Sequence, residues 1–283
     1  MKEMIEYSEY PRTKQSIAAD FRKLGVKRGM TILVHSSLSS IGWVNGGAVA
    51  VIQALMEVVT EEGTIVMPSQ SVELSDPARW GNPPVPQSWW KVIKESMPAY
   101  DPRYTPVTRG LGQIAELFRS FPGVERSEHP NYSFTAWGRD KDKILYPHPL
   151  EFGLGERSPL GKLYDRESYV LQLGAQFDST TCFHLAEYRI EYKKVISLGA
   201  PVLVEGERVW KEYQELEFRE ELFTEVGEFY KREYEVKEGY VGSACCRLFS
   251  IKESVDYAEK WFNEFDSNRN AVREIQARKD GIL

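Results

Sequence analysis

The sequence predicts an α/β fold in which a largely buried sheet carries helices on its faces. Residues 31–68 have the pattern strand, loop, helix, strand, because the apolar runs Thr31–His35 and Gly63–Pro68 flank a stretch, Val51–Val59, whose apolar residues repeat with a helical period. Another apolar run, Tyr169–Gly174, has the composition of a buried strand that ends in a glycine, and a hydroxyl-rich helix start follows it. Strands that alternate with helices along a chain are typical of α/β proteins.

Local signals predict the elements of the first half. A first helix lies between Pro11 and Gly25, with Thr13 as its cap and Gly25 as its stop. Arg109–Arg119 has a glycine-led start and an amphipathic pattern, so a further helix is expected there. Arg126–Gly138 is expected to form a loop and then a short strand, and residues 147–163 a turn-rich connection.

The second half adds a hairpin, a strand and a last helix. Ala200–Val204 and Val209–Trp210 flank a Glu-Gly-Glu turn and predict a hairpin. The glutamates between residues 212 and 225 are mostly expected on a solvated helix surface, although one of them can reach His184 and spacing does not say which. Val241–Ile251 is expected as a strand, and Ser250–Glu253 is a capping box that opens the last helix. Without an internal repeat or a clear linker, residues 1–265 are predicted to form one domain with an inserted 69–104 loop, followed by a charged tail over residues 266–283.

Composition narrows the class of function. The 283 residues carry a net charge of -6, which disfavours nucleic acid as a partner and tolerates a cationic substrate. Three cysteines form no disulfide framework and indicate a reducing compartment. Apolar runs are shorter than the ~18 residues of a membrane span, and the first residues lack a signal-peptide pattern. We therefore expect a soluble cytoplasmic protein with no membrane partner.

His184 is the candidate catalytic residue. It lies in the segment Ser179–Glu187, where Ser179, Thr180 or Thr181 can cap a helix that begins beside the end of a strand. Ligand sites of open α/β sheets gather at such crevices, and histidine suits general-base chemistry near neutral pH. Glu187, three residues on, shares its helix face and can orient the ring or pair with a basic neighbour. The alternative is a structural histidine bonded to its own backbone.

Two loops are candidate binding sites. Residues 36–47 are rich in hydroxyls and glycines and precede a helix, so they can cradle a phosphate, although neither common nucleotide fingerprint is present. The 69–104 loop is long, proline-rich and carries Glu73, Asp76 and Trp80, a mixture that suits a polyamine or an amino sugar. Arg109 and Arg126 are candidate phosphate ligands. The alternatives are an ordinary strand-to-helix connection, a solvated surface loop and surface ion pairs.

Five motifs occur in an order that resembles one family. They are Val34–Trp43, Gly63–Pro68, Arg126–Gly138, Ser158–Gly161 and Thr181–Glu187. Together they resemble the aminoglycoside 3-N-acetyltransferase family, most closely its Bacillus-type branch, over roughly residues 11–262.

The resemblance implies an enzyme that transfers an acetyl group from acetyl-CoA to the 3-amino group of 2-deoxystreptamine aminoglycosides. It implies a single α/β/α sandwich around a central mixed sheet, a monomer or homodimer, and no metal. His184 matches the catalytic histidine of the family and Thr181 a hydroxyl that faces the thioester. Glu215, with Glu217 as second choice, matches the carboxylate partner of the histidine.

The resemblance and the two loops together assign the binding residues. The residues expected to bind CoA are His35, Ser36, Ser37, Leu38, Ser39, Arg109 and Ser133. The residues expected to bind the cationic acceptor are Glu73, Asp76, Trp80, Glu187 and His129.

Three other functions stay open at this point. The acceptor can be an amine other than an aminoglycoside, because the 69–104 loop decides acceptor choice. A metal-dependent hydrolase can use His184 and Glu187 with His35 or His129, although the His-x-x-Glu spacing alone is a weak signal. The third is a CoA-binding protein without activity, whose acidic loop recognises a partner.

Overall fold

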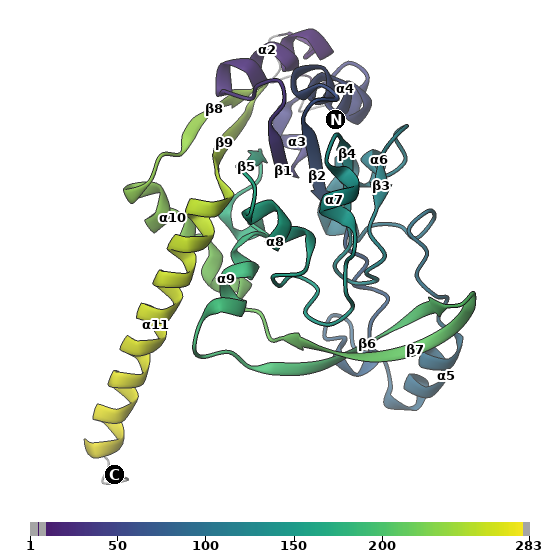
Figure 1. Cartoon of the computed structure of the whole chain (residues 1–283), viewed down its shortest axis with the longest axis vertical. Coiled ribbons are helices and arrows are strands. Elements are labelled where there is room, and N and C mark those ends of the chain that lie inside the picture. The colour runs from purple at the N-terminus through teal and green to yellow at the C-terminus, as the bar shows by residue number, and fades with distance from the viewer. Residues whose placement is uncertain (1–4, 6–9, 280–283) are drawn as a thin grey trace.

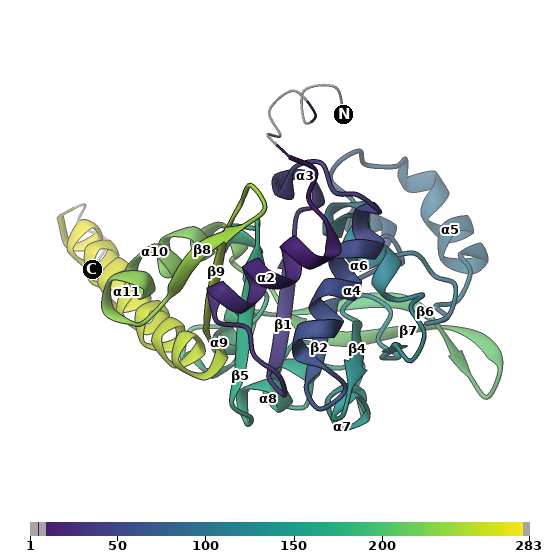
Figure 2. The same ribbon diagram turned by 90° about the horizontal axis from the view of Figure 1, so that it is seen from above.

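A seven-stranded mixed sheet forms the centre of the protein. The computed structural model describes residue 5 and residues 10–279, except for the side chains of Arg109 and of residues 270–279. The strand order is β3-β4-β2-β1-β5-β9-β8, with β1, β2 and β5 parallel and with β4 and β9 antiparallel to their neighbours (Figure 2). The bounds are β1 Thr31–Ser36, β2 Thr64–Pro68, β3 Glu125–Arg126, β4 Phe134–Gly138, β5 Ser168–Leu173, β8 Lys237–Val241 and β9 Ala244–Ser250.

Helices cover both faces of this sheet. Along β1, Ile32 and Val34 enter one hydrophobic core and Leu33 enters the other, because successive side chains of a strand point to opposite faces. The first core is covered by α2 (Lys14–Leu24), α4 (Gly47–Val59) and α6 (Gly112–Phe118). The second is covered by α7 (Lys141–Leu145), α8 (Pro159–Tyr164), α9 (Phe183–Arg189), α10 (Phe223–Glu233) and α11 (Ile251–Lys279) (Figure 1). The expected α/β/α sandwich is confirmed.

The first helix shows how local sequence sets an element. Thr13 accepts a hydrogen bond from the Ser16 backbone, and the Ser16 side chain accepts one from the Thr13 backbone, so the first turn of α2 is closed by a capping box. Gly25 ends the helix with φ of 106°, a left-handed conformation that favours glycine. The predicted cap and stop are both confirmed.

The hairpin is longer than predicted and forms a second, two-stranded sheet. Strands β6 (Val195–Val204) and β7 (Glu207–Leu216) are joined by a two-residue turn at Glu205 and Gly206, both with positive φ. The hairpin reaches α5 (Trp90–Ser96) in the 69–104 loop (Figure 1), and the Tyr100 backbone N–H donates to the Pro201 carbonyl over 3.0 Å.

The glutamate-rich segment is not mainly helical. Glu212 and Glu215 lie on β7, Glu217 follows the strand, and Glu220 and Glu221 lie in the single turn η5 (Glu220–Leu222). The strand buries every second side chain near its end, which takes Glu215 fully into the interior. The expectation of a helix is wrong for the residues on β7, because pairing with β6 outweighs the local helix propensity of glutamate. It is right for Glu225, which lies exposed on α10.

Several short elements were not predicted. The 36–47 loop contains α3 (Leu38–Ile41), and the turn-rich 147–163 connection contains α8, which the Ser158 side chain caps. The 69–104 loop contains α5 and two single turns, η1 (Pro77–Arg79) and η2 (Gln87–Trp89); further turns are η3 (Arg109–Leu111) and η4 (Phe177–Ser179). The strand expected over residues 241–251 is confirmed as β9, and its hairpin partner β8 was not predicted.

The last helix passes the boundary expected at residue 265. Helix α11 continues to Lys279 and extends away from the body of the protein (Figure 1). Asp266, at the start of the predicted tail, is buried and accepts a hydrogen bond from Arg219 at 2.7 Å, so this residue belongs to the packed part of the fold. Within residues 10–279 no helix combines the length and the apolar character that a bilayer crossing needs.

Candidate active site

The candidate site lies where the parallel strands β1 and β5 end side by side. Ser36, the last residue of β1, pairs with Leu173 on β5, and the Ser37 backbone N–H donates to the Leu173 carbonyl over 2.9 Å. The 36–47 loop and the segment that leads to His184 therefore start from the same edge of the sheet. This is the edge at which open α/β sheets bind ligands.

Helix α9 presents His184 in its first turn, as predicted, but without the predicted cap. The helix starts after Cys182, which makes no side-chain cap. Thr180 accepts from the Gln172 amide at 2.9 Å, and the Ser179 hydroxyl donates to the Gln176 carbonyl at 2.7 Å. The turn η4 precedes the helix; the Ser179 hydroxyl closes this turn, and the Thr180 hydroxyl ties its end to Gln172 on β5. The Thr181 hydroxyl makes only a long contact, 3.4 Å, to the Ser179 carbonyl.

His184 is buried and paired with two carboxylates. Its Nδ1–H donates to Glu187 Oε2 over 2.8 Å, and the other Glu187 oxygen accepts the Arg219 backbone N–H over 2.8 Å. Its Nε2 lies 3.4 Å from Glu220 Oε1. The ring packs against Phe218, with ring centroids 4.2 Å apart. Glu187 thus orients the ring, as the i, i+3 spacing in the sequence suggested.

The two carboxylates decide the protonation of the ring. Burial disfavours the charged imidazole, but hydrogen bonds to Glu187 and Glu220 and their negative charges outweigh it and raise the pKa of His184 to about 9. His35, at the end of β1, behaves in the opposite way. Burial and the charge of His184 lower the pKa of His35 to about 4, and its buried Nε2 has no hydrogen-bond partner.

Glu215 is not the partner of His184. Its Oε2 accepts the Gly153 backbone N–H at 2.8 Å, and its Oε1 accepts from the Tyr188 hydroxyl and from the Leu216 backbone at 2.8 Å. The carboxylate therefore joins β7 to α9 and to the turn at residues 152–155. Glu217, the second choice, is exposed and pairs with Lys194. Glu220 belongs to the same acidic run, from which one glutamate was expected to reach His184, and the placement of η5 brings it to the ring.

The serine hydroxyls of the 36–47 loop lie at the sheet edge, where Ser37 accepts a hydrogen bond from Ser40 at 2.9 Å. Ser37 and Ser39 hydroxyls lie 3.2 Å apart, while the partly buried Leu38 packs on the core. Ser133 is fully buried, donates to the Ser69 carbonyl at 2.7 Å and accepts from Arg126, so the expectation that it binds a ligand is wrong. The side chain of Arg109 lies outside the described residues.

Arg126 is a buried anchor for the 69–104 loop and not a phosphate ligand. Its guanidinium donates to the carbonyls of Ser69 and Thr105 and to the hydroxyls of Ser71 and Ser133. None of these partners is charged, and every donor points inward. The sequence placed Arg126 in a loop, where a surface ion pair or a phosphate fork is the usual role.

The acidic and aromatic groups of the 69–104 loop are partly engaged. Asp76 accepts the Ala78 backbone N–H and pairs with Lys94. Glu73 is exposed and accepts from the Thr108 hydroxyl at 2.8 Å. Trp80 donates to Ser75 at 3.0 Å. Of the acceptor ligands expected in this loop, Glu73 keeps a carboxylate without a cationic partner among the described residues.

His129 is structural. Its Nε2–H donates to the Leu150 carbonyl over 3.0 Å, and its Nδ1 accepts the backbone N–H groups of Asn131 and Tyr132. Burial lowers the pKa of the ring to about 4. Both ring nitrogens are engaged, so the expected contact with the acceptor is wrong. Among the described residues, no three His, Cys, Asp or Glu side chains converge as a metal site would require.

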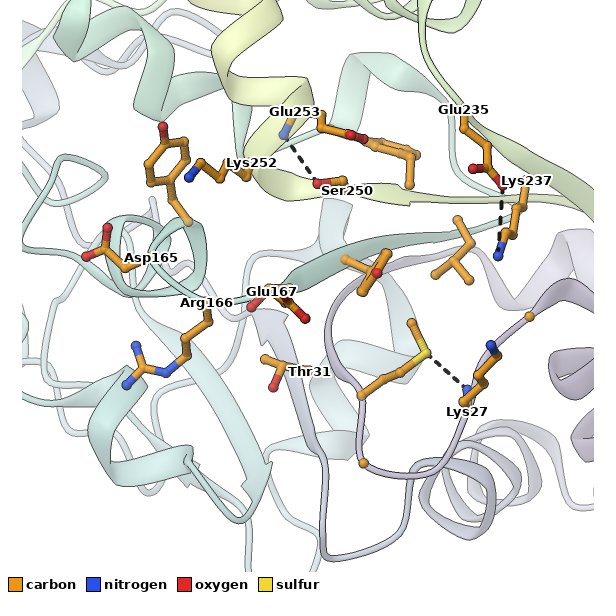
Figure 3. Close-up of a pocket in the computed structure, with 18 of the residues that line it drawn as sticks. Lys27, Thr31, Asp165, Arg166, Glu167, Glu235, Lys237, Ser250, Lys252 and Glu253 are labelled. Atoms are coloured by element: carbon orange, nitrogen blue, oxygen red, sulfur yellow. Dashed lines mark hydrogen bonds and ion pairs between the residues drawn. The ribbon is translucent and has the colours of Figure 1, made fainter.

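A cavity of about 880 Å³ lies at the opposite edge of the sheet. Thr31 and Ser168, which begin β1 and β5, line it together with Ser250 at the end of β9. Figure 3 shows lysines and carboxylates facing one another around it, among them Lys237 with Glu235. Its lining mixes both signs of charge and contains no histidine or cysteine, so we place the candidate chemistry at His184.

Comparisons with known proteins identify the family of this chain. A family model described as aminoglycoside 3-N-acetyltransferase matches residues 33–263. The chain is 73% identical over 267 residues to the SPbeta prophage-derived aminoglycoside N(3')-acetyltransferase-like protein YokD of Bacillus subtilis, a match that covers 94% of this chain and 98% of that protein. The crystal structure of YokD superposes with a TM-score of 0.94, covering 94% of this chain and 99% of that one.

Two more distant structures contain ligands. They are the AAC-IIIb binary with CoASH, 28% identical, and AAC-VIa bound to sisomicin, 29% identical, each with a TM-score of 0.81. Each match covers 90% of this chain, and 97% and 98% of the two structures respectively. The resemblance found in the motifs is thereby confirmed, and this chain belongs to the aminoglycoside 3-N-acetyltransferase family.

Proposed function

We propose that this protein transfers the acetyl group of acetyl-CoA to the 3-amino group of 2-deoxystreptamine aminoglycosides, with His184 as the general base. The observation that carries the proposal is the buried His184–Glu187 pair at the sheet edge where the 36–47 loop begins. The family, a relative that holds CoASH and another that holds sisomicin support the choice of both substrates.

The residues at the sheet edge fit a CoA molecule. Ser37 and Ser39 offer hydroxyls. Gly46 is the N-cap of α4 and Gly47 its first residue, and both have positive φ and no side chain. The unpartnered Nε2 of the buried His35 supplies a further polar group that a ligand can satisfy. These residues would hold the pantetheine arm and the phosphates beside the N-terminus of a 13-residue helix.

The reaction follows from the position of the two ring nitrogens. Glu187 holds the proton on Nδ1, so Nε2 can take a proton from the attacking amine. The amine nitrogen bonds to the thioester carbon, the carbon–sulfur bond breaks, and the imidazolium returns the proton to the leaving thiolate. The Thr181 hydroxyl, which holds only a long contact, is free to donate to the thioester oxygen as negative charge develops.

The test measures CoA release with a panel of amines, including aminoglycosides with and without the 3-amino group. Wild-type protein is expected to use only acceptors with that group, and His184→Ala to lose about 10²–10⁴-fold in kcat while CoA binding survives. If the protein acetylates only amines that lack this group, the acceptor is an amine other than a 2-deoxystreptamine aminoglycoside. Binding of CoA without turnover would identify an inactive CoA-binding protein, and loss of activity with a chelator would favour a metal hydrolase.

A further inference from the structure

The ring of His184 has one fixed partner and one exposed partner. Glu187 is only 3% exposed, and main-chain and ring donors hold both of its oxygens. Glu220 has a side chain that is 68% exposed, and it sits on the single turn η5. Among the described residues its carboxylate has no ion-pair partner except His184. The contact between Glu220 and Nε2 can therefore break without loss of packing, whereas the contact between Glu187 and Nδ1 cannot.

The contact between Glu220 and Nε2 is incompatible with base catalysis. A ring between two carboxylates is an imidazolium at neutral pH, with Nδ1–H and Nε2–H both donating. A general base needs a free lone pair on Nε2. The geometry in this structure is therefore that of a closed resting state.

On the Nε2 side of the ring, the exposed carboxylate of Glu220 is the group that a ligand arriving from solvent can reach. Of the acidic candidates in the 69–104 loop, Asp76 is already paired with Lys94, and Glu73 accepts from the Thr108 hydroxyl and has no described contact with His184. Glu220 is thus the carboxylate next to His184 with which a cationic amine can form an ion pair.

We propose that Glu220 is the binding group for the acceptor's reactive ammonium and that, without acceptor, it closes the proton-accepting nitrogen of His184. The proposal rests on the proposed acetyl transfer. When the ammonium pairs with Glu220, the carboxylate leaves Nε2, and the Nε2 proton of the imidazolium goes to solvent. The freed Nε2 then takes one proton from the ammonium, which becomes the attacking amine, and returns that proton to the leaving thiolate. As the amide forms, the nitrogen passes its second proton to the exposed Glu220 carboxylate and from there to solvent. Arrival of the correct substrate thus switches on the base.

The other charged groups around the ring do not provide the same switch. Glu187 on α9 is held by the Arg219 backbone, and Glu215 on β7 has both oxygens bound elsewhere. His35 on β1 is neutral at physiological pH, since burial and the charge of His184 lower its pKa to about 4. The charge of Glu220 is therefore the contribution that acceptor binding changes.

The test compares Glu220→Gln with the matched control Glu221→Gln. Glu221 is exposed, lies next in the same turn and has no described contact with the ring. NMR of the His184 ring nitrogens in the free protein gives its pKa, and steady-state kinetics give the pH profile of kcat/KM and the KM of each substrate. The melting temperatures of both variants check that they fold.

For Glu220→Gln we expect the ring pKa and the acid limb of kcat/KM to fall by about 1 pH unit or more. The acceptor KM should rise about tenfold, with the acetyl-CoA KM unchanged. Glu221→Gln should match wild type in every measurement. An unchanged ring pKa, or an unchanged acceptor KM, in Glu220→Gln overturns the inference while the proposed function stands. Wild-type protein that acetylates no amine overturns the proposed function, and with it the acceptor role, whatever the ring titration shows.

Discussion

Replacing Glu187 by Gln should disable the base by giving the imidazole the wrong tautomer. The Arg219 backbone N–H donates to one Glu187 oxygen, so a Gln at this position must turn its carbonyl oxygen toward Arg219. Its NH₂ group then faces Nδ1 of His184 and donates to it. The ring carries its proton on Nε2 in that arrangement, and Nε2 can no longer accept one.

The expected loss of kcat follows from what it costs the variant to keep the Nδ1–H tautomer. To keep the proton on Nδ1, the Gln amide must flip, which leaves the buried Arg219 N–H without an acceptor at a cost of about 1–3 kcal/mol. The lost charge of the carboxylate removes a further ~1.5–3 kcal/mol of charge-assisted hydrogen bonding to the imidazolium. Together these come to about 4 kcal/mol, which corresponds to a roughly 10³-fold lower kcat.

The assay is the release of the CoA thiol at saturating substrates, together with long-range ¹H–¹⁵N NMR of the His184 ring. Glu217→Gln is the matched control, since Glu217 pairs with the surface residue Lys194 and does not contact the ring. We expect the control to keep wild-type kcat and the Nδ1–H tautomer. A Glu187→Gln protein that keeps Nδ1–H, or whose kcat lies within tenfold of wild type, would refute the reasoning.

Two further predictions concern the groups that hold the site together. Arg126→Lys should lower the free energy of unfolding by about 2 kcal/mol, because an ammonium cannot reproduce the four neutral contacts that anchor the 69–104 loop. Since this loop is expected to bind the acceptor, the acceptor KM should rise more than the acetyl-CoA KM. Denaturant titration and steady-state kinetics test this, and equal changes in both KM values would contradict it. His129→Ala should cost about 3 kcal/mol of unfolding free energy, since it leaves a cavity and frees three hydrogen-bonding groups. Its kcat should stay within about threefold of wild type, and a loss of kcat like that of His184→Ala at unchanged stability would assign His129 to catalysis.

Local sequence determined the elements whose signals lie within a few residues. The capping box at Thr13 and the stop at Gly25 depend on backbone groups within one helical turn. The β1–α4–β2 unit follows from its hydrophobic period. The placement of His184 in a first helical turn beside the end of β5, and of Glu187 on the same face, needed only the 3.6-residue repeat of a helix.

The partners of the buried polar groups were decided by the tertiary structure. Glu215 and Glu220 are both glutamates in one acidic run, yet β7 carries the first into the interior and η5 holds the second beside Nε2. Likewise Ser133 and Arg126 lie in a motif that resembles the family. In the structure both side chains point inward, where Arg126 donates to Ser133 and Ser133 donates to the carbonyl of Ser69 at the start of the 69–104 loop. A short motif identifies a residue type, whereas a buried carboxylate or guanidinium is stabilised by whichever donors and acceptors the fold brings within about 3 Å. Glu215 finds the Gly153 N–H 62 residues away and Arg126 the Ser69 carbonyl 57 residues away, so these contacts are a property of the assembled sheet and hairpin.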